Sequence, residues 1–188
     1  MLNVHGLPTL VTPGMTEMQK KKLLILAASN GENLKLARRF SEAAEALEAS
    51  PAILDLTTTG LPLFTPQAHA AGHPPALLTL AQQMEEAACW LICAPEYNAS
   101  IPPVLTSTIA WLSVHSDDFR SLFDSRPIAL ATYSGSGGTA VLAAMRLQLV
   151  YLGANVVGRQ LIANESRPVR DETIVDVLTR LLKLAHGC

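Results

Sequence analysis

The sequence predicts an α/β fold in which helices cover both faces of a doubly wound parallel sheet. Short, continuous apolar runs alternate with longer segments of helical periodicity along most of the chain. Strands that are apolar on both sides are typical of parallel sheets covered by helices on each face. Five strands at this spacing suit the strand order 2-1-3-4-5. With 188 residues, of which 49% are hydrophobic, the chain is long enough for one full core and shows no second domain.

Each expected element follows from its local pattern. Residues 23–28 form the first continuous apolar run, and residues 33–50 repeat apolar side chains at helical spacing. The other expected strands are 52–56, 89–93, 128–132 and 156–162, the last interrupted by Gly158, and the other expected helices are 76–88, 102–114, 139–152 and 171–186. The stretch 57–75 is polar, contains prolines and is long for a connection, so we expect a functional segment or an interface there.

Residues 1–19 precede this pattern. They contain Pro8 and Pro13, and they lack the basic start and long apolar stretch of a secretory signal. We expect a poorly structured N-terminal extension over residues 1–19 and a single domain over residues 20–188. No apolar stretch approaches the roughly 18 residues needed to cross a bilayer, so we expect no membrane association.

Charge and cysteine content narrow the function classes. The net charge of −2 gives no electrostatic reason to expect nucleic acid or an anionic membrane as a partner. Cys89 and Cys93 lie four residues apart in one expected strand, about 13 Å at 3.3 Å per residue, which is too far for a disulfide. Together with Cys188 they form no spacing pattern, which favours reduced core thiols and a cytoplasmic location. His69 and His73 lie in a loop rich in proline and glycine, and we expect no metal site there.

Three loops are expected to meet at one edge of the sheet, because the strand order places the carboxyl ends of strands one, three and four side by side. Residues 29–33 open a helix, whose free N–H groups and polar side chains suit a phosphate. Residues 95–100 bring the flat face and hydroxyl of Tyr97 together with groups that can hydrogen-bond a planar heterocycle. Residues 134–138 are rich in glycine, so a ligand can approach their backbone closely. The candidate cofactor-binding residues are Ser29, Asn30, Gly31, Asn33, Leu34, Pro95, Glu96, Tyr97, Asn98, Ser134, Gly135, Ser136 and Gly137. We assign no side chain as a catalytic acid, base or nucleophile.

Two motifs carry a resemblance to a known family. The turn Pro95-Glu96-Tyr97-Asn98 follows the third expected strand, and the next helix ends in Trp111-Leu112-Ser113. In these features, and less strongly in the glycine-rich loop, the sequence resembles the NADPH-dependent FMN reductase family of the flavodoxin-like superfamily. The resemblance extends from about Lys21 to His186. It implies a flavodoxin-like fold, noncovalent FMN at the three loops, and NADPH or NADH as cosubstrate. It also implies hydride transfer through the flavin to a small-molecule acceptor such as a quinone, an azo compound or free flavin.

The sequence departs from the family pattern in the first loop. The stretch Ala28-Ser29-Asn30-Gly31-Glu32-Asn33 is about three residues shorter than the family's phosphate loop and lacks its arginine. Thr106 and Ala110 also stand where the family usually has a lysine and an acidic residue. An alternative therefore stays open, a flavodoxin-like binding or regulatory protein with weak or absent flavin binding. The nearly neutral charge disfavours a flavodoxin-type electron carrier.

The same resemblance bears on assembly, since members of this family commonly pair through the helices that follow strands three and four. Residues 102–114 carry more apolar side chains than one core stripe needs, and Leu61, Leu63 and Phe64 have no evident burial partner. Exposed apolar groups on this scale usually mark an interface. We therefore expect a homodimer or homotetramer, with Trp111 or Phe64 at or near the contact.

Overall fold

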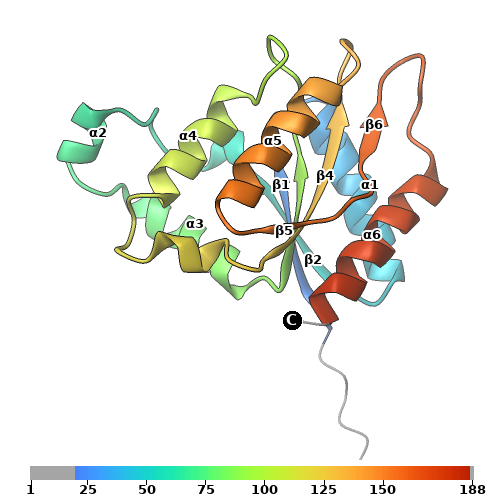
Figure 1. The fold of residues 1–188 in the computed structure, drawn as a ribbon, viewed down its shortest axis with the longest axis horizontal. Coiled ribbons are helices and arrows are strands. Elements are labelled where there is room, and N and C mark those ends of the chain that lie inside the picture. The colour runs from blue at the N-terminus through green and yellow to red at the C-terminus, as the bar shows by residue number, and fades with distance from the viewer. Residues whose placement is uncertain (1–19, 187–188) are drawn as a thin grey trace, which may run out of the picture.

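The protein folds around one parallel sheet with helices on both faces (Figure 1). The structure is a computed structural model and describes residues 20–186. The expectation for residues 1–19, and the last two residues of the expected domain, lie outside the described residues. The strands are β1 (Lys22–Ala27), β2 (Ser50–Asp55), β3 (Cys89–Cys93), β4 (Pro127–Tyr133), β5 (Asn155–Val156) and β6 (Leu161–Ala163). The helices are α1 (Glu32–Ala46), α2 (Pro66–Ala70), α3 (Pro75–Glu86), α4 (Pro103–Leu112), α5 (Thr139–Tyr151) and α6 (Asp171–His186), with 3-10 turns η1 (Leu56–Thr58) and η2 (Phe119–Leu122).

The strand order β2-β1-β3-β4-β5 confirms the predicted topology, and all the pairs are parallel. The prediction of a single fifth strand over 156–162 is wrong. This segment contributes two short strands, β5 and β6, and both pair with β4. Between them, Arg146 of α5 donates to the carbonyl oxygens of Val156 and Val157 at 3.1 and 2.6 Å. Its guanidinium thus binds the backbone at the point where the chain leaves the ladder.

Alternation along the strands divides the core into two layers. In β1, Leu24 and Leu26 face the layer formed with α3, α4 and α5, whereas Leu23 and Ile25 face the layer formed with α1 and α6. The first helix is shorter than expected, since α1 ends at Ala46 and the strand begins at Ser50. Glu48 lies between them with a φ of 59°, a left-handed conformation that stops a helix.

The connection between β2 and α3 is held on α4 by an aromatic contact. Trp111 is fully buried, and its indole N–H donates to the carbonyl of Pro62 at 2.8 Å. The ring of Phe64 meets Trp111 edge-on at 5.1 Å between centroids, and the Phe64 N–H donates to Ser107 Oγ at 2.8 Å. The premise that this segment lacks a burial partner is therefore wrong for Phe64, whereas Leu63 is 68% exposed. The extra apolar residues of α4 serve to bury it, and the Trp111 side chain is not free to contact another subunit.

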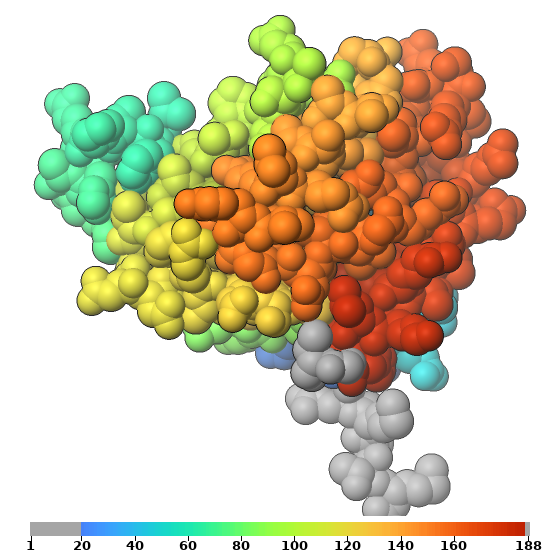
Figure 2. Space-filling view, in the orientation of Figure 1, coloured from blue at the N-terminus to red at the C-terminus, as the bar shows by residue number. Residues whose placement is uncertain are grey.

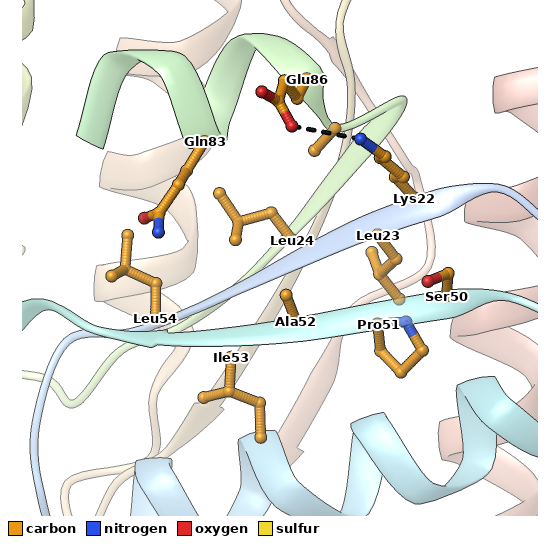
Figure 3. A pocket seen from close by; sticks show the side chains of 11 residues that line it. Lys22, Leu23, Leu24, Ser50, Pro51, Ala52, Ile53, Leu54, Gln83 and Glu86 are labelled. Carbon is orange, nitrogen blue, oxygen red and sulfur yellow. Dashed lines mark hydrogen bonds and ion pairs between the residues drawn. The ribbon is translucent and has the colours of Figure 1, made fainter. Parts of the chain in front are cut away.

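At one side of the sheet, β2 forms an edge that is only partly covered. Within residues 20–186, β2 pairs with β1 alone. The Ser50 N–H donates to Lys21 on the β1 side, so alternation turns the backbone groups of Pro51 and Ile53 outward. A hollow of about 280 Å³ lies between β2 and α3, and Lys22 and Glu86 form an ion pair of 3.1 Å beside it. Figure 3 shows the side chains that line this hollow. Because proline has no N–H, Pro51 removes a donor from the outward row.

Candidate functional site

The three loops expected to form a site lie at the same edge of the sheet, at the end toward which the strand arrows point in Figure 1. The backbone ladder continues past the strands and places the loops next to one another. Ala28 donates its N–H to Cys93 at 2.9 Å, and Ala94 donates its N–H to Ala131 at 3.1 Å. The loops after β1, β3 and β4 therefore start side by side, as the strand order predicted.

Asn33 joins the first loop to the third. Its side chain is 2% exposed, its Nδ2 donates to the carbonyl of Tyr133 at 3.0 Å, and its Oδ1 accepts from the Tyr133 N–H at 2.9 Å. Because both partners are backbone groups of fixed polarity, the orientation of the carboxamide is determined. This side chain was expected to be a phosphate donor, but both of its polar atoms already serve the contact between the loops. Its place among the cofactor-binding residues stays a prediction that rests on its backbone N–H.

The rest of the first loop offers mostly neutral groups. Gly31 caps α1 without a side-chain hydrogen bond, and the first N–H groups of a helix have no partner within it. Ser29 is half-buried and Asn30 is exposed. Glu32 lies in the first turn and accepts from Lys35 at 2.7 Å, a contact that raises the pKa of Lys35. Leu34 is partly buried and packs against the core layer of α1 and α6, and its place among the cofactor-binding residues stays a prediction.

The second loop is a tight hairpin that presents Tyr97. Tyr97 and Ser100 exchange backbone hydrogen bonds of 3.1 and 3.0 Å, and the two residues between them, Asn98 and Ala99, have φ values of 51° and 57°. Positive φ at both central residues defines a type I′ turn. Asparagine tolerates this conformation, whereas an alanine there is strained. The tyrosine ring is 51% exposed, so one face is open to a ligand.

Glu96 joins the second loop to the third. It accepts from Ser136 Oγ at 2.5 Å and from the Val141 N–H in the first turn of α5 at 3.2 Å. The hydrogen bond from Ser136 is the main cause that lowers the pKa of Glu96, with backbone N–H groups of α5 adding to it. A carboxylate at a helix N-terminus is favourable in its own right. Glu96 therefore fixes the glycine-rich loop, a role that the sequence alone did not indicate.

The glycine-rich loop combines an open side with a packed side. A Cβ placed on Gly135 or Gly137 would meet no heavy atom within 4 Å, and Gly137 has a φ of 106°. A Cβ on Gly138, by contrast, would lie 2.5 Å from Thr132 Cγ2, and the φ there is 76°. Gly138 was absent from the candidate residues, and it is the glycine that both packing and backbone require. The open side at Gly135 and Gly137 is a cradle into which a flat ligand could approach the backbone.

The geometry suits the ring of a flavin better than its phosphate. Tyr97 and the glycine cradle provide an aromatic face and accessible backbone, and the buried Ser134, bonded to Ser136 at 3.1 Å, stiffens the loop between them. The phosphate end has the helix N-terminus and neutral side chains but no cation in the loop.

Comparison with protein families shows to which family the chain belongs. The model of the family described as NADPH-dependent FMN reductase matches residues 21–167, most of the chain. The chain belongs to that family. Its fold is accordingly the flavodoxin-like α/β fold that the motifs implied.

Named relatives agree with the family. The chain is similar to an NAD(P)H-dependent FMN reductase of Pseudomonas aeruginosa, with 35% identity over 44% of this chain and 43% of that protein. It is also similar to the quinone reductase of Escherichia coli, with 29% identity over 69% of this chain and 66% of that protein. The matches thus span less than two thirds of either relative. Among solved structures, the flavoenzyme FerB of Paracoccus denitrificans, an NAD(P)H:(acceptor) oxidoreductase, has the same fold with a TM-score of 0.72 at 17% identity. That alignment covers 89% of this chain and 98% of FerB.

Other groups considered from the sequence lie apart from this site. The rings of His69 and His73 stack at 5.9 Å between centroids in the connection that carries α2. In the described part of the chain, no three histidine, cysteine or acidic side chains gather as they would around a metal ion. Between residues 20 and 186, no helix has the length and apolarity to cross a membrane.

Proposed function

We propose that the protein is an NAD(P)H-dependent flavin oxidoreductase that holds FMN noncovalently at the three loops. The observation that carries this proposal is the way Asn33 and Glu96 lock the loops together while leaving the Tyr97 face and the cradle of Gly135 and Gly137 open. Membership in the family supports it. The acceptor is a small molecule, such as a quinone, an azo compound or free flavin.

The chemistry of hydride acceptance and release belongs to the flavin when it is bound. The chain's own contribution is binding and orientation. Tyr97 would cover part of the ring, and backbone N–H groups near Gly137 would favour negative charge on a bound ring. Glu96 would hold the loop through Ser136 and α5 without touching the ligand. NADPH and NADH both remain candidates as cosubstrate.

A pair of matched glycine variants tests the site. Gly137 and Gly72 have nearly the same φ, 106° and 105°, and a Cβ on either would meet nothing within 4 Å. Gly72 lies between α2 and α3, away from the three loops (Figure 1). Gly137→Val is expected to abolish flavin binding, measured by quenching of flavin fluorescence, whereas Gly72→Val leaves it unchanged.

Tyr97→Ala is expected to weaken flavin binding and to raise the KM for added FMN in NAD(P)H oxidation. Equal flavin binding by wild type, Gly137→Val and Tyr97→Ala would show that the three loops are not the site. A purified protein that neither retains nor binds flavin would favour the alternative, a binding or regulatory protein of the same fold.

We infer a homodimer, able to double to a tetramer, and place its contact on α5 rather than on Trp111. Along α5, Leu147, Val150 and Tyr151 are 76%, 54% and 73% exposed, and they form one apolar stripe. Figure 2 shows this helix across the middle of an open face. Light scattering is expected to give a multiple of 20.1 kDa, and Leu147→Glu is expected to return the single-chain mass. A single-chain mass for the wild type at micromolar concentration would refute the inference.

We also propose a reducing, cytoplasmic location. Cys89 and Cys93 are free and buried in β3, and burial raises the pKa of Cys89 to about 12. Buried, protonated thiols of this kind are core residues and need no oxidising compartment. Cell fractionation followed by detection of the protein in the soluble fraction is the direct test.

A further inference from the structure

The three loops carry negative charge and no positive charge. Residues 28–33, 94–102 and 133–138 contain Glu32 and Glu96 but neither lysine nor arginine. A phosphate monoester carries a charge of about −1.5 to −2 at pH 7. A flavin with a 5′-phosphate would therefore bring an anion to loops that are already acidic, whereas riboflavin would bring no charge.

The basic side chains next to the first loop are already paired. A hollow of about 230 Å³ between α1 and the segment before α6 is lined by Glu32, Lys35, Arg39 and Tyr133 among others. Lys35 lies 2.7 Å from Glu32, and Arg39 lies 2.5 Å from Asp171. Each cation is thus already next to a carboxylate, which offsets much of its charge toward a further anion.

The neutral donors are also reduced. Asn33 is buried, and its oxygen and one of its two amide N–H groups are bonded to Tyr133. The accessible neutral donors are those of Ser29, Asn30 and the first N–H groups of α1. The positive end of a helix favours an anion modestly. A carboxylate in the first turn already takes up this favourable interaction and weakens the attraction for a second anion. Glu32 occupies this position.

We propose, on the basis of the flavin function proposed above, that the site does not select for the 5′-phosphate and that Glu32 sets this lack of selection. The isoalloxazine ring carries recognition, and riboflavin and FMN bind with dissociation constants within about threefold of each other. Glu32 and Lys35 offset each other's charge, and the helix N-terminus alone favours an anion only modestly. The flavin substrate class is thus the isoalloxazine ring system, with or without its phosphate.

The test is a titration of the full chain, freed of copurified flavin, with riboflavin and with FMN, followed by flavin fluorescence. Glu32→Gln is expected to tighten FMN about two- to fivefold, the range of one exposed charge contact, and to leave riboflavin unchanged. Glu32→Arg is expected to tighten FMN further. Glu45→Gln removes an exposed carboxylate from the far end of the same helix and serves as the matched control, with no change expected for either flavin.

Ionic strength supplies an independent readout. Raising salt from about 20 mM to about 300 mM screens exposed charges, so FMN binding to the wild type is expected to stay constant or tighten. Binding that weakens steeply with salt would reveal a cation at the phosphate and overturn the proposal. A dissociation constant for FMN more than about tenfold below that for riboflavin would overturn it too, since one charge-assisted hydrogen bond accounts for that ratio. If neither flavin binds, the proposed function itself fails; if both bind and only FMN binds tightly, this inference alone fails.

Discussion

The contact between Asn33 and Tyr133 is expected to contribute substantially to stability, and Asn33→Ala tests it. The substitution removes hydrogen bonds of 3.0 and 2.9 Å between residues 100 positions apart. Each such bond contributes about 1 kcal/mol, and each backbone group left without a partner in a buried place costs about 1 kcal/mol more. The expected loss is therefore about 2 to 4 kcal/mol, a large part of the roughly 5 to 15 kcal/mol typical of a domain.

Urea unfolding measures this loss. With a slope of about 2 kcal/mol per molar urea, the midpoint is expected to fall by about 1 to 2 M. Asn33→Asp keeps one acceptor but opposes the Tyr133 carbonyl with a carboxylate, so it should be at least as damaging. Asn155→Ala removes a single exposed amide bond of 3.2 Å to Ser125 and is the matched control, with an expected loss below about 1 kcal/mol. A loss for Asn33→Ala no larger than that of the control would refute the reasoning that this pair locks the loops.

Three further outcomes follow from the second and third loops. Gly138→Ala places a Cβ 2.5 Å from Thr132 Cγ2 at a φ of 76°. It is expected to lower the free energy of unfolding, measured in urea, by about 2 to 4 kcal/mol. Gly137→Ala introduces backbone strain without a clash and is expected to lower it by about 1 to 2 kcal/mol. Ala99→Gly relieves the left-handed alanine and is expected to raise stability by up to about 1 kcal/mol in thermal unfolding. Folding lowers the pKa of Glu96, so the stabilising effect of its carboxylate is present at neutral pH and is lost as the pH falls below the ordinary pKa of 4.5. The difference in unfolding free energy between wild type and Glu96→Gln should therefore shrink on acidification. A difference independent of pH would count against the hydrogen bonds assigned to this carboxylate.

The sequence predicted the sheet and the meeting of the three loops because both depend on regular local patterns. Apolar runs identify strands, and the parallel order then places their carboxyl ends together. The bonds of Asn33 to Tyr133 and of Glu96 to Ser136 join residues 100 and 40 positions apart. No local signal shows which distant group such a side chain will meet, so these two contacts could not be predicted from the sequence.

The burial of Trp111 by the connection before α3 was not predicted for a similar reason. Periodicity shows that α4 has more apolar residues than one stripe needs, but it does not show what covers them. The carbonyl of Pro62 and the ring of Phe64 reach Trp111 from a loop about 50 residues earlier. The split of the last strand was missed for another reason: the side chain of Arg146, in the preceding helix, binds the backbone carbonyls of Val156 and Val157, and the apolar pattern of the strand does not show this contact.

Pro51 has a consequence for how a newly made chain avoids association with its neighbours. An outer strand with a full row of donors and acceptors is a template on which other chains can aggregate. In the part of the chain that the structure describes, β2 is an outer strand, and its centre, Ala52 and Ile53, is apolar and exposed. Proline beside these residues interrupts the row. Replacement by valine would restore the donor and complete a short segment with strong strand preference, so the soluble yield on refolding at high concentration is expected to fall even where the folded state gains stability.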